Sequence, residues 1–435
     1  MQKNEKLERI ALVFLTFIIV FSYFIGFYLN ENSAGGGEGD FLSFTLKNLK
    51  LFNTNSLSEA LGVVNTDSSS KLFQSSRIPG FYIFNKFLNP FTENPIYYRL
   101  SILLFSILVP IIFYLSLVLK FKNTKKIYLL FLASLVLMSP YFRTSAIWGN
   151  EENFAYITLV ASYYFLIKYL STENHKISLL SLVILFSSLC VYFDQKFTLV
   201  PAVCFFIIMF DQNKFKLKIY TFFLYAFFSL PVIYLIYIWG GLLPPVDQVG
   251  RNVHIGRFNF QHVGYALSII AFYLFPFVIS KIFEERKISF LYTFDKKELI
   301  VFIATIFYLI FFLFFYDISS EVLVGKGVFY KITILISDNV FVQKLIMCLV
   351  ILLSIKFIFI TLQKEFINIF VLLFLILTPV LYRPVLQEYY DPMIFLLFFT
   401  FLKTKFLINF KSLMILFVYL TIFLTFTNIY YSKII

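Results

Sequence analysis

Long apolar runs separated by short polar stretches cover most of the chain, and the first run occupies residues 10–29. The later runs lie at residues 98–119, 127–142, 154–170, 177–193, 197–210, 219–239, 264–280, 299–316, 341–362, 366–382, 391–402 and 412–431. An apolar α-helix of roughly 20 residues crosses a bilayer core of about 30 Å. The pattern therefore predicts an all-α polytopic membrane protein with about thirteen transmembrane helices.

Residues 30–97 form the longest stretch without a convincing membrane span. Within it, residues 41–52 place apolar side chains at helical spacing, and residues 81–88 do the same. Short amphipathic helices of this kind lie in the membrane interface. We therefore interpret residues 1–435 as a single transmembrane domain in which the 30–97 loop carries interfacial helices.

Lysine clusters alternate with the apolar runs and indicate the orientation of the chain. The clusters lie at residues 120–126, 213–218, 281–298 and 403–411. Because cytoplasmic loops are enriched in Lys and Arg, these loops and the amino terminus are predicted to be cytoplasmic. The intervening loops, beginning with residues 30–97, are then predicted to lie on the outer face of a bacterial inner membrane.

Composition supports the membrane assignment and changes how the charge is interpreted. The chain is 60% hydrophobic and 14% charged, with a mean hydropathy of +0.84 and a formal charge of +13. A charge of this size could indicate a nucleic-acid partner, but the basic residues are distributed over short loops between spans. The distribution of the positive charge therefore indicates which loops are cytoplasmic, and no nucleic acid is expected as a partner.

Two acids, Glu38 and Asp40, follow the first run within the glycine-rich segment 35–40. A carboxylate held at a membrane border can act as a general base toward a hydroxyl, or can help to bind a divalent cation. Farther along the loop, Arg77 precedes a Pro-Gly-Phe-Tyr sequence at 79–82. This segment is either an anchoring turn or a place where Arg77 meets a lipid phosphate.

These features together resemble the GT-C superfamily of membrane glycosyltransferases, which use sugars linked to lipid phosphates. The resemblance covers the general topology and roughly the first hundred residues, and its motifs are short: the acids of the first outer loop and the sequence SRIPGFY at 76–82. It implies a catalytic acid in this loop, here Asp40 with Glu38 as helper. The adjacent acidic pair of the family is spread here as Glu38-Gly-Asp40. With this resemblance we also expect Asp40 and Glu152 to bind a Mg or Mn ion.

The next outer loops add further candidates. Glu151 and Glu152 either cap the following helix or contact the acceptor or sugar, and Arg143 is a candidate ligand for the donor phosphate. Asp194 and Lys196 lie between two closely spaced runs, where they either pair with each other or leave Lys196 available to the donor phosphate.

Two late outer loops complete the predicted site. Phosphate contacts are predicted for Arg251, His254 and Arg257, since three-residue spacing places them on one side of a helix, and for Arg383. Acceptor or sugar contacts are predicted for Gln387, Glu388 and Tyr389. Solvated loops and simple turn chemistry are the alternative explanations for both segments.

The predicted activity is transfer of a sugar from a polyprenyl-phosphate donor to a glycan or lipid acceptor on the outer face. A single displacement with Asp40 as base would invert the anomeric configuration. The alternatives are a flippase or transporter of lipid-linked saccharides, an O-antigen polymerase or ligase, and a purely structural membrane protein. A transporter is expected to have broken or charged helices near mid-membrane, whereas most polar residues here lie at the ends of runs.

Overall fold

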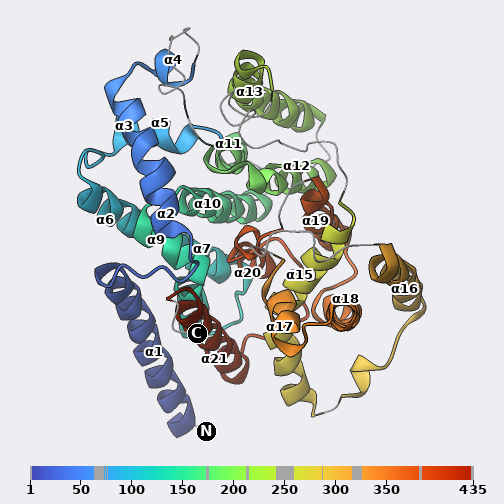
Figure 1. Cartoon of the computed structure of the whole chain (residues 1–435). Helices are drawn as coiled ribbons and strands as arrows, with labels where there is room; N and C mark the ends of the chain where they lie inside the picture. The colour runs from blue at the N-terminus through green and yellow to red at the C-terminus, as the bar shows by residue number, and fades with distance from the viewer. Residues whose placement is uncertain are drawn as a thin grey trace. The chain divides into compact units, whose positions relative to one another are not determined.

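The computed structural model describes residues 2–62, 73, 75, 77–172, 176–211, 215–241, 259–286, 288–315, 326–381 and 385–432. Within these ranges helices joined by turns and loops make up the chain, together with an isolated antiparallel bridge between Leu362 and Thr404. It divides into two compact units: residues 1–253 with 420–435, and residues 254–419. Figure 1 gives the helix labels.

The first unit begins with a long apolar helix and continues with shorter ones. Its helices are α1 (Gln2–Tyr28), α2 (Gly37–Asp40), η1 (Phe41–Thr45), α3 (Leu46–Thr54), α4 (Leu57–Ala60), α5 (Gly80–Leu88), α6 (Pro95–Ser106), α7 (Leu108–Lys120), α8 (Lys126–Ser134), η3 (Leu135–Met138), α9 (Pro140–Trp148), α10 (Glu152–Leu170), α11 (Ile177–Phe193), η4 (Gln195–Thr198), α12 (Leu199–Asp211) and α13 (Phe215–Trp239). The end of α21 (Phe410–Tyr431) belongs to the same unit.

Helix α10 occupies the core of the first unit, because it packs against both α7 and α11 (Figure 1). Local sequence signals set several of the boundaries. The Asn94 side chain accepts from two backbone amides at the start of α6, and Pro95 takes the first helical position. Ser139 and Pro140 begin α9 in the same way, and Gly149 ends it in the left-handed conformation, with φ 72°.

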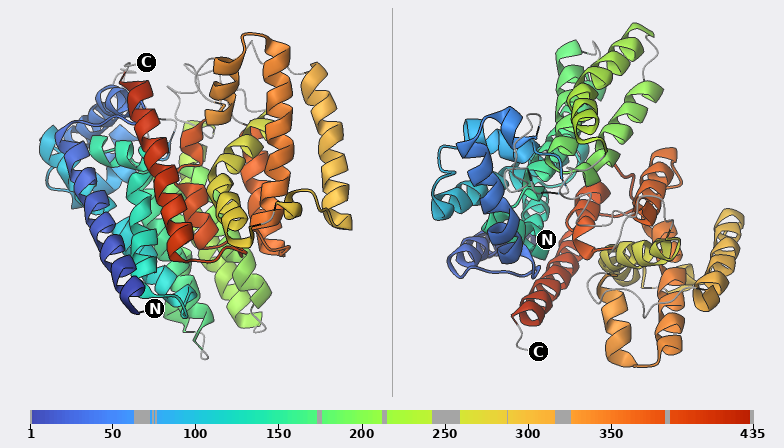
Figure 2. Two further views of the ribbon diagram at one scale, coloured as in Figure 1. Left: turned by 90° about the horizontal axis from the view of Figure 1, so that it is seen from below. Right: turned by 45° about the horizontal axis from the view of Figure 1, so that its top comes forward.

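The second unit is built around α15 (Gln261–Glu285), which packs against α17 (Val328–Ile336) and α18 (Val340–Thr361), as Figure 2 shows. Its other helices are η5 (Ser289–Leu291), α16 (Lys296–Phe315), α19 (Phe366–Leu377), η6 (Thr378–Leu381), η7 (Gln387–Tyr389), α20 (Met393–Phe399) and the first part of α21. Polar loops gather at each end of α15. The His262 ring nitrogen contacts the Pro379 carbonyl at one end, and Asn409 donates to Glu284 at the other.

Seven helices of the described part are long and apolar enough to cross a membrane, or eight if the bent pair at 126–148 counts as one span. The protein is thus all-helical in its described part and has the helices of a multi-pass membrane protein. Every predicted run coincides at least in part with a helix, but several of these helices are short. Helix α20, for example, spans 7 residues, all of them buried. The predicted interfacial segments 41–52 and 81–88 are helical as well.

Candidate functional site

Five charged side chains from three predicted outer loops meet in the first unit. The Arg77 guanidinium donates to Glu151 Oε1 at 2.9 Å and to Glu152 Oε1 at 2.7 Å. Its Nε lies 3.9 Å from Asp194 Oδ2, and the Lys196 ammonium lies 3.1 Å from the same oxygen. We call these five residues the charged cluster. The structure thus brings together five residues that the sequence alone could place only in three separate loops.

Tight backbone packing holds the three loops of the charged cluster together. The Ile78 backbone amide donates to Gln195 Oε1 at 3.1 Å, which joins the 77–79 turn to the turn after α11. Gly80 lies so close to α11 that a Cβ at this position would overlap the Tyr192 carbonyl oxygen. Because a backbone oxygen cannot move aside cheaply, the sequence requires glycine at the start of α5. Arg77 is thereby kept beside α11.

The two glutamates occupy the turn between α9 and α10. Glu151 is the residue before the first turn of α10, and its side chain makes no capping hydrogen bond. Glu152 instead accepts from the Ser145 hydroxyl of α9 at 2.8 Å. Both carboxylates therefore point toward Arg77 rather than serving as helix caps. Asp194, in contrast, does cap η4 by accepting from the Lys196 backbone amide at 3.1 Å.

Burial and the neighbouring charges together raise the pKa of Glu151 and lower the pKa of Glu152. The Glu151 side chain is 9% exposed, and its burial raises its pKa to about 7 against the opposing effect of Arg77. Burial also acts to raise the pKa of Glu152, but Arg77 and Lys196 outweigh it and lower that pKa to about 2. Of the two carboxyls, Glu151 is therefore the one that is more readily protonated, and Glu152 is the one that is held ionised by the neighbouring cations.

The predicted catalytic acids lie on a neighbouring element. Helices α2, η1 and α3 form one continuous helical run over residues 37–54, which we call the acid-bearing helix. Glu38 and Asp40 are exposed in its first turns. Its middle section, η1, is a π-helical turn immediately after Asp40, and such turns are frequent at functional sites.

Contacts fix the acid-bearing helix against the turn that holds the charged cluster. The Thr45 hydroxyl donates to Asn150 Oδ1 at 3.3 Å, one residue before Glu151. Phe41 stacks on Tyr98 with ring centroids 6.2 Å apart, and the Tyr98 hydroxyl donates to the Gly149 carbonyl. Asp40 precedes Thr45 by roughly 7 Å of helix axis. The exposed acid and the two buried glutamates therefore lie on segments that contact each other through Thr45 and Asn150.

Arg99 lies near the acid-bearing helix and was not among the sequence candidates. Its guanidinium lies 4.0 Å from the centre of the Trp148 ring and donates to the Ile147 carbonyl and to Asn30. Glu38 interacts favourably with its charge. The sequence pattern that could have identified Arg99 is an arginine directly after two tyrosines, at residues 97–99. These residues lie at the start of an apolar run, where aromatic and basic side chains mark the membrane interface.

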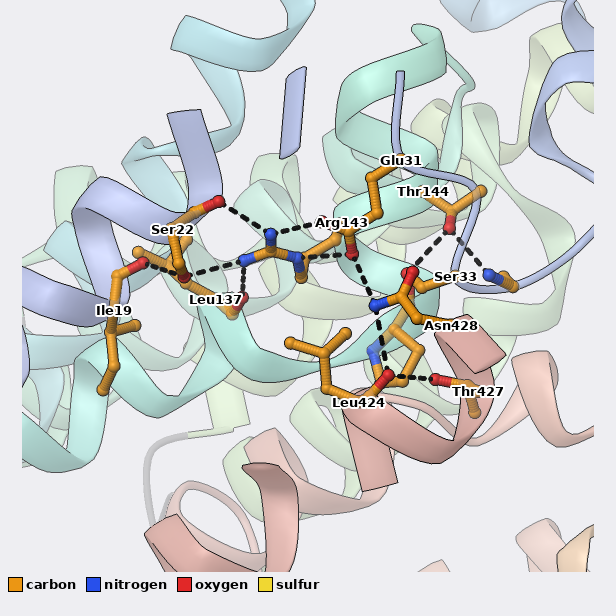
Figure 3. Close-up of polar contacts among 12 residues, drawn as sticks. Ile19, Ser22, Glu31, Ser33, Leu137, Arg143, Thr144, Leu424, Thr427 and Asn428 are labelled. Atoms are coloured by element: carbon orange, nitrogen blue, oxygen red, sulfur yellow. Dashed lines mark hydrogen bonds and ion pairs between the residues drawn. The ribbon is translucent and has the colours of Figure 1, made fainter. Parts of the chain in front are cut away.

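Arg143, predicted to bind a phosphate, lies in a separate buried network (Figure 3). Its guanidinium donates to Glu31 Oε1 at 2.9 Å and to the Ser22 carbonyl at 2.8 Å, and Arg143 is 2% exposed. Asn428 of α21 donates to the same Glu31 oxygen at 3.4 Å. In the structure, Arg143 thus ties together α1, α9 and the end of α21.

The late candidates belong to the second unit or lie outside the described residues. Gln387 is buried in η7, and its side-chain oxygen accepts from the Val328 backbone amide at 3.3 Å, while Glu388 and Tyr389 are partly exposed beside it. Lys326, which sequence reasoning did not single out, is buried near these residues with its ammonium 4.7 Å from the Tyr330 ring centre. Arg251, His254, Arg257 and Arg383 lie outside the described residues.

Comparison with protein-family models, curated proteins and solved structures finds no match for this chain. Its function is therefore inferred from its residues and their geometry. Within the described part of the chain, no group of three or more His, Cys, Asp or Glu side chains is arranged to hold a metal ion, and the expected divalent cation stays a prediction. In the structure, Glu152 pairs with Arg77 and accepts from Ser145.

Proposed function

We propose that this protein is a membrane glycosyltransferase of the GT-C type, which transfers a sugar from a polyprenyl-phosphate donor to a glycan or lipid acceptor on the outer face of a bacterial inner membrane. In this proposal the amino terminus is cytoplasmic, and the shorter and bent helices add to the long ones to give about thirteen crossings. No observation specifically favours a transporter or a polymerase.

A single observation carries the proposal: polar side chains from three predicted outer loops form one site. Arg77, the two glutamates and the Asp194–Lys196 turn are in direct contact, and the acid-bearing helix packs against the α9–α10 turn that carries the glutamates. A transferase that works on lipid-linked sugars needs such a polar site beside apolar helices, because the donor combines a charged phosphate with a hydrocarbon chain.

In the proposed reaction Asp40 removes the proton of an acceptor hydroxyl, and the resulting oxygen attacks the anomeric carbon of the donor sugar. The bond between this carbon and the phosphate oxygen breaks, so that polyprenyl phosphate leaves with the electron pair. One displacement inverts the configuration. Asp40 suits this role because its exposed position lets an acceptor approach it.

The charged cluster serves to hold the substrate in this proposal. Lys196, whose side chain is 17% exposed, offers a cation to the donor phosphate. Glu151 and Glu152 accept hydrogen bonds from sugar hydroxyls, while Arg77 keeps both carboxylates in place. The expected Mg or Mn ion stays a prediction, and no step of this scheme depends on it.

Substitution of Asp40 tests the assignment of the base. Cells that lack the protein are complemented with the wild type, Asp40→Asn or Glu93→Gln, and their lipid-linked glycans are analysed by mass. Glu93 is an exposed acid of the same loop and provides the control. We expect Asp40→Asn to resemble the empty vector and Glu93→Gln to resemble the wild type. Full activity of Asp40→Asn at equal protein level would contradict the assignment.

A further inference from the structure

A cavity of about 380 Å³ lies in the second unit, away from the charged cluster in sequence. It is bounded by the end of α15, the segment before α16, the last turns of α18 and the chain around Lys405. Its polar lining consists of Lys281, Thr293, Asp295, Glu298, Lys356 and Lys405. The segments that form it are all predicted cytoplasmic loops or the helix ends beside them.

The two acids of this cavity already have cationic partners. Glu298 lies 3.0 Å from the Lys356 ammonium and 3.4 Å from that of Lys364. Asp295 pairs with Lys364 as well. Because both carboxylates are occupied, they leave little negative charge to balance the remaining lysines.

Two lysines of the lining therefore provide unbalanced positive charge. Lys405 donates to the Phe359 carbonyl at 2.8 Å, and within the described ranges it forms no ion pair with a carboxylate. Among the described residues, Lys281 pairs with a single acid, Glu285 on its own helix, at 3.5 Å. Burial lowers the pKa of Lys405, and repulsion from Lys281 and Lys364 lowers it further. An anion in the cavity would relieve this repulsion.

The backbone around Lys405 is held in place, so the cavity does not depend on a loose loop. The Lys405 amide donates to the Thr361 carbonyl at 2.8 Å, and the Leu362–Thr404 bridge joins the same two segments. The Asn368 side chain adds bonds to the carbonyl and the amide of Lys403. A preorganised cationic pocket binds an anion without the loss of conformational entropy that ordering a flexible loop would cost.

We propose that this cavity binds a phosphate group on the cytoplasmic side of the membrane, with Lys405 and Lys281 as its principal ligands. The group is either the headgroup of an anionic phospholipid or a soluble phosphate ester, since both present the same oxygens to lysine. This site is independent of the proposed transferase activity.

Binding measurements on the full-length protein in detergent separate the two sources. In one arm the protein is titrated with dioctanoyl phosphatidylglycerol, with dioctanoyl phosphatidylcholine for comparison. In the other arm it is titrated with inorganic phosphate against chloride at equal ionic strength. Thermal stability reports binding in both arms. The variants are Lys405→Gln, Lys281→Gln and the charge-preserving Lys405→Arg, with Lys122→Gln, an exposed lysine of another predicted cytoplasmic loop, as control.

We expect saturable stabilisation in at least one arm, which then identifies the source of the phosphate. Each Lys→Gln variant should weaken this binding by about tenfold, the effect of losing roughly one charge-assisted contact. Lys405→Arg and Lys122→Gln should bind as the wild type does. The proposal is wrong if neither arm shows saturable binding, or if Lys405→Gln and Lys281→Gln, with unchanged melting temperatures in the absence of ligand, bind as tightly as the wild type.

Discussion

Arg77 lies between two glutamates and near a third carboxylate, so a cation that sequence alone presents as exposed is enclosed by acids. A direct phosphate contact was predicted for this residue. That contact stays a prediction, and in the structure Arg77 neutralises and orients Glu151 and Glu152. Residue types and loop positions could be predicted from the sequence, but the pairing could not, because it joins side chains from loops far apart in the chain.

Replacement of Arg77 should therefore damage both stability and activity. Arg77→Gln leaves three carboxylates with Lys196 as the nearest cation, and we expect a loss of about 2–3 kcal/mol in the free energy of unfolding, since the Arg77 side chain is 23% exposed. Arg77→Lys keeps the charge but not the two-pronged contact and should lose less. Denaturation in detergent measures both. Equal stability of Arg77→Gln and the wild type would show that the cluster does not hold the loops together.

Glu151 gives the charged cluster a pH dependence of definite sign. Its pKa is raised from 4.5 to about 7 by burial, so between these values the folded protein binds more protons than the unfolded chain. The free energy of unfolding should therefore fall as the pH rises from about 5 to about 7. Glu152, whose pKa is lowered, affects stability only at more acidic pH.

Glu151→Gln should flatten this fall in stability between pH 5 and pH 7, as measured by melting temperature. The exposed Glu93 provides the matched control, because Glu93→Gln removes the same charge outside the charged cluster. A Glu151→Gln variant with the same pH profile as the wild type would contradict the burial of an ionisable carboxyl at this position.

At the scale of elements, the acid-bearing helix is the part of the site that sequence described best. Helical spacing predicted residues 41–52, and the structure extends this helix back to Gly37. The π-helical turn after Asp40 could not be predicted, because no residue pattern marks it. The contact of Thr45 with Asn150 could not be predicted from the sequence either, because it depends on how the helix lies against the α9–α10 turn.

Two glycines of the acid-bearing helix offer a matched test of that packing. A Cβ on Gly37 would overlap Thr144 Cγ2 and lie 2.8 Å from Trp148 Cδ1, whereas a Cβ on Gly39 meets nothing within 4 Å. We expect Gly37→Ala to lower the melting temperature and the transfer activity. Gly39→Ala should keep both or gain up to about 1 kcal/mol from helix propensity. The packing assigned to α2 is wrong if the two variants behave alike.

Hydropathy predicts about thirteen crossings, whereas seven helices of the described part are long and apolar enough to cross a membrane, and α20 is among the shorter helices. Residues 391–402 are as apolar as a membrane span, yet the helix covers only Met393–Phe399 and all of it is buried. Phe398 stacks on Phe277 of α15 with ring centroids 3.9 Å apart. An apolar run reports burial, but it does not distinguish burial in lipid from burial in protein.

At the scale of the whole molecule, contacts within the first unit agree with the predicted alternation of loops. Lys125 and Tyr128 bond to Glu5 and Glu8 at the beginning of α1. The Trp148 indole instead donates to the Glu31 carbonyl just past the other end of α1. The predicted cytoplasmic loop and a predicted outer loop therefore contact opposite ends of the first apolar helix.

Cysteine labelling in intact cells tests this orientation. Lys50→Cys and Asn123→Cys place thiols at exposed positions in a predicted outer and a predicted cytoplasmic loop. Cys348 is changed to Ser in both variants, and the other two cysteines are buried. A membrane-impermeant maleimide should label Lys50→Cys in intact cells, and Asn123→Cys only after lysis. The reverse pattern would place the charged cluster on the cytoplasmic side and contradict the proposed topology.

The most direct test of the proposed transferase is the mass of the lipid-linked glycans in cells with and without this protein. We expect the deletion to accumulate glycans one sugar shorter than those of the wild type, and wild-type protein, but not Asp40→Asn, to restore the full length. Complete glycans that accumulate on the inner face of the membrane in the deletion would indicate a flippase instead and would contradict the proposed activity.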